Sequence, residues 1–314
     1  MGKKDVLTVE YLAECEHFAD MFNAAFFDGK EVVKKNELED ADSELKDNEI
    51  PKGAEVRRDN VKRWLRGTKL AILVIEDQSN IDYHMVIRNL YAEGLYYRNE
   101  WKKRKNLHRK RKDLVTQHEF ISGMKQDDKF EPLVNLVVYF GEEPWEGPRT
   151  LEELLDLSGE NACLRPYVNN YHLNLFDYHD YENFEGFQSE LRIVFEFLRY
   201  AKDKNALRKI VAEHSENYYN VSNETYQMIA VLTNSTELLK CDEKYENEEG
   251  GWNMCKALED IRLEGIEEGI KEGEGLLADL ISRLFLDDRT EDAKLAARDE
   301  EARKRFYREY GMID

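Results

Sequence analysis

The stretch Arg57–Tyr91, RRDNVKRWLRGTKLAILVIEDQSNIDYHMVIRNLY, decides the fold class. Its centre, Leu70–Ile75, is short, apolar and partly β-branched, which is typical of a strand buried on both faces. The residues that follow carry apolar and aromatic side chains at helical spacing, among them Met85, Tyr91 and Leu95. A buried strand followed by an amphipathic helix predicts an α/β layer domain.

Further elements on both sides of this stretch fit the same class. Residues 5–27 place Phe18, Met21, Phe22, Ala25 and Phe26 at helical spacing, which predicts an amphipathic helix. A second buried strand is predicted at Leu133–Phe140, and a third at residues 171–177. From Phe187 to about Cys241 the apolar period is helical again. Residues 37–49 hold seven acids and one base, and they predict a solvated loop.

Composition excludes several classes of protein. The chain has 314 residues, 41% of them hydrophobic, which is enough for a core and excludes global disorder. Its longest apolar run, Leu70–Ile75, is far too short to span a membrane, and the first residues lack the apolar stretch of a signal peptide. The four cysteines form no close pair, which excludes a zinc ribbon, a redox motif and a disulfide scaffold. We therefore expect a cytoplasmic protein with reduced cysteines and no membrane partner.

The carboxyl end of the Arg57–Tyr91 strand is the candidate site. Glu76 and Gln78 are two residues apart, so their side chains share one face of an extended chain. Asp59 lies 17 residues before Glu76, which suits an antiparallel neighbour that returns to the same edge. Two carboxylates and the backbone carbonyl of Asp77 would offer Mg²⁺ the oxygen ligands it prefers. The alternative is that Glu76 simply ends a strand at the surface.

An ordered set of motifs resembles the Rpn family of bacteria, recombination-promoting nucleases also described as putative transposases, within the PD-(D/E)XK nuclease superfamily. The resemblance spans roughly residues 15–200 and, more weakly, the tail. The motifs that carry it are Asp20–Asn23, Arg57–Asp59, Ile75–Ser79, Asp82–Met85 with Arg88 to Tyr91, Glu119–Met124, and Tyr139–Pro148 (YFGEEPWEGP).

The resemblance implies a restriction-endonuclease-like core, with a mixed sheet flanked by helices, that cleaves DNA with Mg²⁺, Mn²⁺ or Ca²⁺. It implies that Asp59 and Glu76 bind the metal, which activates water and polarises the phosphate. Gln78 occupies a position where the superfamily often has Lys; it can position water but brings no charge. Arg88 is our candidate for the missing cation, and Asp20 for a further acid near the metal, with a capping or surface role as its alternative. A catalytically inactive DNA-binding or protein-interaction module remains the competing interpretation.

A strongly basic run follows the predicted helix, in a chain whose net charge is −20. Between residues 98 and 112 it has nine bases and one acid, Glu100. A positive stripe beside the metal site would bind DNA phosphates without reading sequence. The alternative is a solvated helix face. The candidate DNA-binding residues are Arg98, Lys102, Lys103, Arg104, Lys105, Arg109, Lys110, Arg111 and Lys112.

The predicted domains are a nuclease core at residues 1–186, a helical region at 187–255 and a helical tail at 256–314. Glycine recurs every fourth residue at Gly265, Gly269 and Gly273, and residues 242–314 carry 22 acids and 12 bases. Such a glycine stripe is weak in an isolated helix and favours close approach of a partner helix. We therefore expect the tail to form a homodimer or to regulate DNA binding. The alternative is a solvated helix without a partner.

Overall fold

The computed structural model describes residues 3–41, 44–45, 56–57, 59–64, 67–75, 81–235, 238, 245–248 and 250–312. The chain forms two compact units, residues 1–240 and 241–314. Glu76, Asp77 and Gln78 lie outside the described residues.

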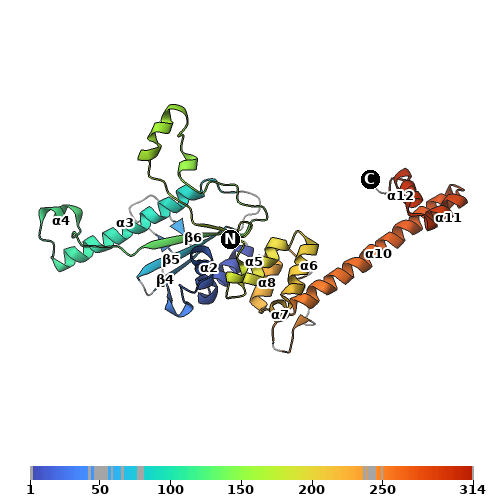
Figure 1. The fold of residues 1–314 in the computed structure, drawn as a ribbon, viewed down its shortest axis with the longest axis horizontal. Coiled ribbons are helices and arrows are strands. Elements are labelled where there is room, and N and C mark those ends of the chain that lie inside the picture. Colours follow the sequence, from blue (N-terminus) through green and yellow to red (C-terminus); the bar gives the residue numbers. More distant parts are fainter. Residues whose placement is uncertain are drawn as a thin grey trace. The chain divides into compact units, whose positions relative to one another are not determined.

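A mixed five-stranded sheet forms the centre of the first unit (Figure 1). Its order is β1 (Leu38–Asp40), β4 (Asn60–Trp64), β5 (Thr68–Ile75), β6 (Leu133–Tyr139) and β7 (Leu175–Asp177). β1 pairs with β4, and β4 with β5, in antiparallel fashion, whereas β5 pairs with β6, and β6 with β7, in parallel fashion. A separate short pair joins β2 (Glu44–Leu45) to β3 (Val56–Arg57). The predicted α/β class, with a mixed sheet flanked by helices, is confirmed.

The two apolar runs of the sequence form the central strands. β5 pairs with β6 from Lys69↔Leu133 to Ile75↔Tyr139. Parallel neighbours need a crossover connection, which here is the long helix α3 (Met85–Arg111) followed by α4 (Gln117–Ser122). The connection from β6 to β7 contains the short 3₁₀ turns η2 (Glu152–Leu154) and η3 (Gly159–Tyr167).

The acidic stretch at residues 37–49 was wrongly predicted to be loop throughout. After the 3₁₀ turn η1 (Lys35–Glu37), residues Leu38–Asp40 form the edge strand β1. Leu38 is buried, and the Lys62 ammonium of β4 lies 2.6 Å from Asp40 Oδ1. One buried side chain and one cross-strand ion pair are too little to give the sequence an apolar period.

The helix predicted at residues 5–27 is two helices. α1 (Lys3–Ala13) and α2 (Cys15–Phe27) are separated by Glu14, whose backbone is extended. The apolar positions named in the sequence fall on α2, where Phe18, Met21 and Phe22 are almost completely buried.

α3 packs on one face of the sheet with its first three turns. Met85 and Val86 form a core cluster with Val137 and Tyr139 of β6, and Tyr96 packs on Leu133 at the start of that strand. The helix therefore runs antiparallel to β5 and β6. Its second half continues beyond the sheet, and α4 lies at its far end (Figure 1).

The other face of the sheet is covered by α2 and α5 (Leu191–Tyr200). Phe195 of α5 has its ring centroid 5.5 Å from Phe140 and 4.9 Å from Phe176. Other described elements of this unit are η4 (Phe184–Gly186), α6 (Lys204–Glu213), α7 (Ser215–Tyr219) and α8 (Asn223–Leu232).

Helices α5, α6, α7 and α8 belong to the same compact unit as the sheet. α8 packs on α1, where Tyr11 Oη lies 2.6 Å from Thr225 Oγ1. The division of the chain therefore falls near Lys240, between the boundaries expected at residues 186 and 255.

The second unit consists of the long helix α10 (Met254–Leu286), then α11 (Thr290–Arg298) and α12 (Glu300–Glu309). Leu280 and Leu284 of α10 pack against Ala296 and Phe306 in a small core. The apolar continuation of the glycine-rich segment is thus covered by the chain's own last two helices. In the described part of the chain, no helix is sufficiently long and apolar to span a membrane.

Candidate functional site

The end of the β4–β5 pair is where the predicted metal site begins. Asp59 directly precedes β4, and Asn60 is the register partner of Ile72 in β5. β4 is thus an antiparallel neighbour of β5, as the 17-residue spacing predicted, and its first residue lies opposite a residue three positions before the end of β5. Glu76 is the next residue of the sequence after β5, but it and Gln78 lie outside the described residues, so the assembled site stays a prediction.

Arg88 lies in the first turns of α3, which pack near the carboxyl ends of β5 and β6. Its guanidinium donates a hydrogen bond to Asp82 Oδ2 at 2.9 Å, and its side chain is half exposed. Asp82 also accepts a hydrogen bond from the backbone N–H of His84, just before the helix. Arg88, the candidate compensating cation, is therefore paired with a carboxylate of the loop that precedes α3.

Asp20 is buried on α2, and its carboxylate holds a turn of the backbone. It accepts hydrogen bonds from the backbone N–H groups of Gln188 and Ser189 at 2.8–3.0 Å, and from Ser189 Oγ at 2.6 Å. These contacts tie α2 to the turn before α5. Asp20 thus has a structural role in the described residues, and its place near a metal stays a prediction.

The basic run forms a projecting arm, which we define as residues 98–131, the outer half of α3 and the chain that returns through α4. The arm carries 11 Lys and Arg against 6 Asp and Glu, a net charge of +5. It extends past the amino-terminal ends of β5 and β6, not the end that Glu76 follows. The run points this way because α3 is antiparallel to the strands; a positive stripe beside the metal site stays a prediction, since Glu76 lies outside the described residues. Arg109 lies 21 residues beyond Arg88, about 30 Å along the helix.

The inner cations of the arm are largely engaged. Lys103 pairs with Glu100 at 2.9 Å, Arg104 donates to the Lys129 carbonyl and pairs with Asp128, and the Lys105 ammonium lies over the Trp101 ring. Arg98 and Lys102 also have partners. These contacts fix the arm's own structure.

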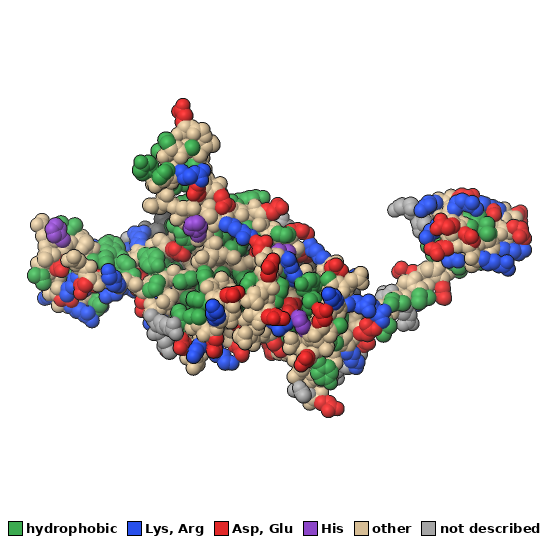
Figure 2. Space-filling view, viewed as in Figure 1, with side chains coloured by type: hydrophobic (Ala, Val, Ile, Leu, Met, Phe, Trp, Pro, Cys, Tyr) green, Lys and Arg blue, Asp and Glu red, His purple; other side chains and the backbone are tan. Residues whose placement is uncertain are grey.

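The outer cations differ. Arg109, Lys110, Arg111 and Lys112 are all exposed at the carboxyl end of α3. In the described part of the chain, none of these four side chains makes an ion pair or hydrogen bond. Basic and hydrophobic side chains gather on this projecting part of the molecule (Figure 2). These four are the members of the predicted DNA-binding set best placed to contact phosphates.

The aromatic cluster around β7 belongs to the core. Phe176 packs on Tyr181 and Phe187, with ring centroids 5.0 and 6.0 Å apart. Tyr178 is buried as well and donates a hydrogen bond to the Gly141 carbonyl. Packing in the core accounts for these rings.

Asp177 and His179 form a polar pair at the end of β7 that sequence reasoning missed. Asp177 Oδ1 lies 2.7 Å from His179 Nδ1, and Asp177 Oδ2 accepts from the Trp145 N–H at 2.8 Å. Burial raises the pKa of Asp177, but the hydrogen bonds from His179 and Trp145 outweigh it and lower the pKa below 3.8. His179 Nε2 lies 3.1 Å from the Glu142 carbonyl. With both nitrogens engaged, the pair fastens the YFGEEPWEGP segment to β7.

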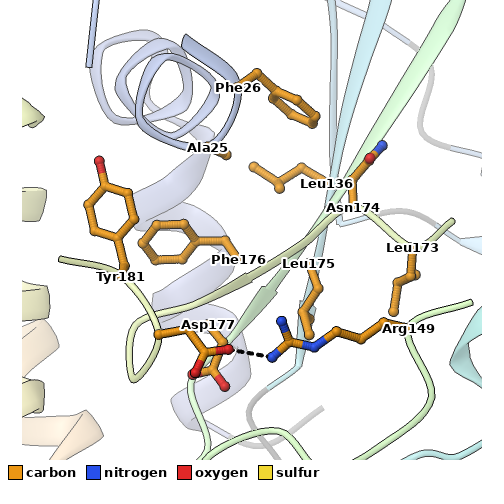
Figure 3. Close-up of a pocket in the computed structure, with 11 residues that line it drawn as sticks. Ala25, Phe26, Leu136, Arg149, Leu173, Asn174, Leu175, Phe176, Asp177 and Tyr181 are labelled. Atoms are coloured by element: carbon orange, nitrogen blue, oxygen red, sulfur yellow. Dashed lines mark hydrogen bonds and ion pairs between the residues drawn. The ribbon is translucent and has the colours of Figure 1, made fainter. Parts of the chain in front are cut away.

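A pocket of about 370 Å³ lies between α2 and the edge of the sheet. Figure 3 shows Phe26, Leu136 and Phe176 on its apolar side and Arg149 at its polar side. Arg149 is paired with Asp180 at 2.5 Å. None of the predicted site residues lines this pocket. In the described residues, no group of three or more His, Cys, Asp or Glu is placed to hold a metal ion.

Comparison with known proteins relates the chain to a family. The profile of a family described as "Putative transposase, YhgA-like" matches residues 67–228. This span runs from just before β5 through the arm and β7 to α8; it contains Glu76, Gln78 and Arg88 but not Asp59. No curated protein and no solved structure matches the chain.

Proposed function

The chain belongs to the family of YhgA-like putative transposases, whose description points to a role in transposition or recombination, and on that premise we propose that it is a metal-dependent DNA endonuclease of low sequence specificity. The resemblance of its motifs to recombination-promoting nucleases supports the same reaction. The arm supports DNA as the substrate.

The observation that carries the proposal is the register of β4 against β5. Asn60 lies opposite Ile72, three residues before the end of β5, so Asp59 lies toward the end of β5 that Glu76 follows in sequence, which supports the proposal. Two carboxylates converging from adjacent strands are a suitable donor set for a hard divalent cation. Asp59 and Glu76, with the Asp77 carbonyl, would hold Mg²⁺ (or Mn²⁺ or Ca²⁺).

The bound ion would supply Lewis acidity to the scissile phosphate and lower the pKa of a nearby water. The protein's own contribution is positional. Gln78 would accept or donate a hydrogen bond to orient the attacking water, and Arg88 would offset charge on the phosphate by exchanging Asp82 for the substrate.

The outer arm would hold DNA at a distance from the cut. A separation of about 30 Å along α3 is close to one turn of B-DNA, about 34 Å. Contacts of Arg109–Lys112 with phosphates would add affinity without selecting a sequence.

The second candidate is a DNA-binding module that has lost cleavage. It is favoured by the ion pair of Arg88 with Asp82 and by Gln78, which together leave no unpaired cation assigned to the phosphate.

The endonuclease and the inactive DNA-binding module can be distinguished by incubating the full chain with supercoiled plasmid and Mg²⁺, Mn²⁺ or Ca²⁺. We expect metal-dependent nicking that is lost in Glu76→Ala and kept in Glu182→Gln, an exposed carboxylate elsewhere on the unit. Salt-sensitive plasmid binding without nicking in any metal would favour the inactive module. Equal nicking by Glu76→Ala would refute the site.

A further inference from the structure

The end of the arm presents apolar side chains to solvent. Val115, Phe120 and Ile121, which we call the arm tip, are 82%, 65% and 73% exposed. Clustered exposed apolar side chains mark contact surfaces more often than isolated ones do. Neither the family description nor the proposed cleavage chemistry accounts for them.

The arm tip is held rigidly. Thr116 and Glu119 form a capping box at the start of α4, and Glu119 also accepts from the Val115 N–H at 2.6 Å. Trp101 Nε1 donates to the Ser122 carbonyl at 2.9 Å, which fastens the end of α4 to α3. The chain that carries the tip therefore has little freedom to fold its apolar side chains away.

The turn after α4 requires glycine. Gly123 has a φ of +72°, and a Cβ there would lie 2.7 Å from Lys105 Cγ. Glycine thus lets the returning chain pass directly against α3, which sets the exposed face of α4.

The charge around the tip selects the partner. Arg109–Lys112 lie immediately before Val115 and have no carboxylate partner among the described residues. Asp113 is turned inward to His108 and Lys125, and Glu119 serves the capping box, so these two nearby acids are engaged within the arm. An apolar tip bordered by cations complements a polyanion that also offers apolar surface.

We propose that the arm tip is a wedge for duplex DNA, with Phe120 and Ile121 pressed against a base step or the sugars while Arg109–Lys112 hold the flanking phosphates. Architectural proteins use apolar side chains in this way to unstack and bend DNA. The inference rests on the proposed function only in taking DNA as the substrate; it requires no cleavage.

The test uses the full chain in EDTA, so that no cleavage occurs, and a duplex of about three helical turns that contains 2-aminopurine. Because unstacking raises 2-aminopurine fluorescence, we expect the signal to rise on binding by the wild-type protein. Phe120→Ala with Ile121→Ala should lose most of that rise and bind severalfold more weakly. A duplex with an internal mismatch, which is already partly unstacked, should be bound more tightly by the wild type and show a smaller loss in the variant.

The matched control is Tyr167→Ala, which removes an aromatic side chain that is 84% exposed outside the arm and should change neither binding nor fluorescence. If the tip variant binds and unstacks DNA as the wild type does, the wedge is refuted while the proposed function stands. If the wild type binds no DNA, both are refuted. If the tip variant lowers the mass measured by light scattering and leaves DNA binding unchanged, the tip is a contact between protein copies and the wedge is refuted.

Discussion

His108 Nε2 lies 2.9 Å from Asp128 Oδ2, and this contact joins the outer half of α3 to the chain that returns from α4. The other ring nitrogen lies 2.8 Å from Asp113 Oδ1. Because an ionised carboxylate only accepts, this arrangement favours the doubly protonated imidazole, in which both ring nitrogens donate. The residue is buried, so the arm is built around an ion triad.

The ion triad predicts a pH range in which the arm is most stable. The hydrogen bond with Asp113 raises the pKa of His108 above 6.5, against the effect of burial. The hydrogen bond from His108 lowers the pKa of Asp113 below 3.8. Burial raises the pKa of Asp128, but the Lys125 N–H and His108 lower it further. The His108 contribution is complete below pH 6.5 and is lost as the pH rises through its raised pKa. The carboxylate contributions are complete above 3.8 and are lost as the pH falls through their lowered pKa values.

We therefore expect the arm to resist proteolysis best between about pH 4 and 6.5 and to become more susceptible at pH 8–9. Cleavage sites can be mapped by mass spectrometry, with rates corrected for the protease's own pH dependence. His108→Gln should remove the difference between pH 6 and 9, whereas His118→Gln, on the exposed face of α4, should keep it. A pH-independent arm in the wild type would show that the triad does not stabilise it.

A structural role for Asp20 makes a second prediction. Asp20→Asn replaces the carboxylate, whose two oxygens accept from Gln188 and Ser189, by a neutral amide with a single accepting oxygen. It should therefore lower the free energy of unfolding in urea by about 1–3 kcal/mol. Plasmid nicking by the folded variant should stay near the wild-type rate. Glu16→Gln, an exposed acid on the same helix, should change stability by less than about 1 kcal/mol. Loss of nicking with unchanged stability would instead make Asp20 a metal ligand.

The sequence predicted the elements that depend on local pattern. Leu70–Ile75 and Leu133–Phe140 stood out because a central parallel strand is apolar on both faces. β1 did not, because one buried residue, Leu38, gives no period. The direction of the arm also escaped prediction: a charge run does not reveal that its helix has left the sheet, and the partner Asp128 of His108 lies 20 residues later. In the candidate site, the spacing between Asp59 and Glu76 predicted the pairing of β4 with β5. The ion pair of Arg88 with Asp82 was not predicted.

Charge compensation at the proposed site can be tested at two residues. Gln78→Lys should keep or raise the nicking rate, since it restores the cation that the superfamily often has there. Arg88→Ala should lower the rate roughly tenfold or more, because a donor to the developing charge is lost. Asp82→Asn is the matched control, since it removes the ion pair but keeps the arginine. Normal nicking by Arg88→Ala would mean that the metal alone balances the charge.

The division of the basic run into engaged and unengaged cations predicts unequal effects on DNA affinity. Replacing Arg109, Lys110, Arg111 and Lys112 by Gln should flatten the slope of log K against log salt by about 0.9 for each lost phosphate contact. Replacing Lys102–Lys105 should change the slope less, because Lys103 and Arg104 are already paired. Titrations of unrelated duplexes by fluorescence anisotropy decide this. If replacing Arg109–Lys112 leaves the slope unchanged, these cations do not contact phosphates and form only a solvated helix end.

The glycine stripe of α10 supports the last prediction, that the tail associates with a second copy. Gly269 and Gly273 have open space where a Cβ would be, and Leu263, Ile266 and Ile270 on the same stretch are about half exposed. In a single chain, alanine at both glycines should stabilise the helix by about 1 kcal/mol per site. In a dimer that uses this face, the same methyl groups would hold the two helices apart.

We expect Gly269→Ala with Gly273→Ala to raise helicity but lower the mass measured by light scattering. Added salt should strengthen wild-type association by screening the acidic surface. Gly275→Ala, which is also open but off the four-residue stripe, should raise helicity and leave the mass unchanged. A monomeric wild type, or a double variant that associates equally well, would mean that the stripe is a solvated helix face.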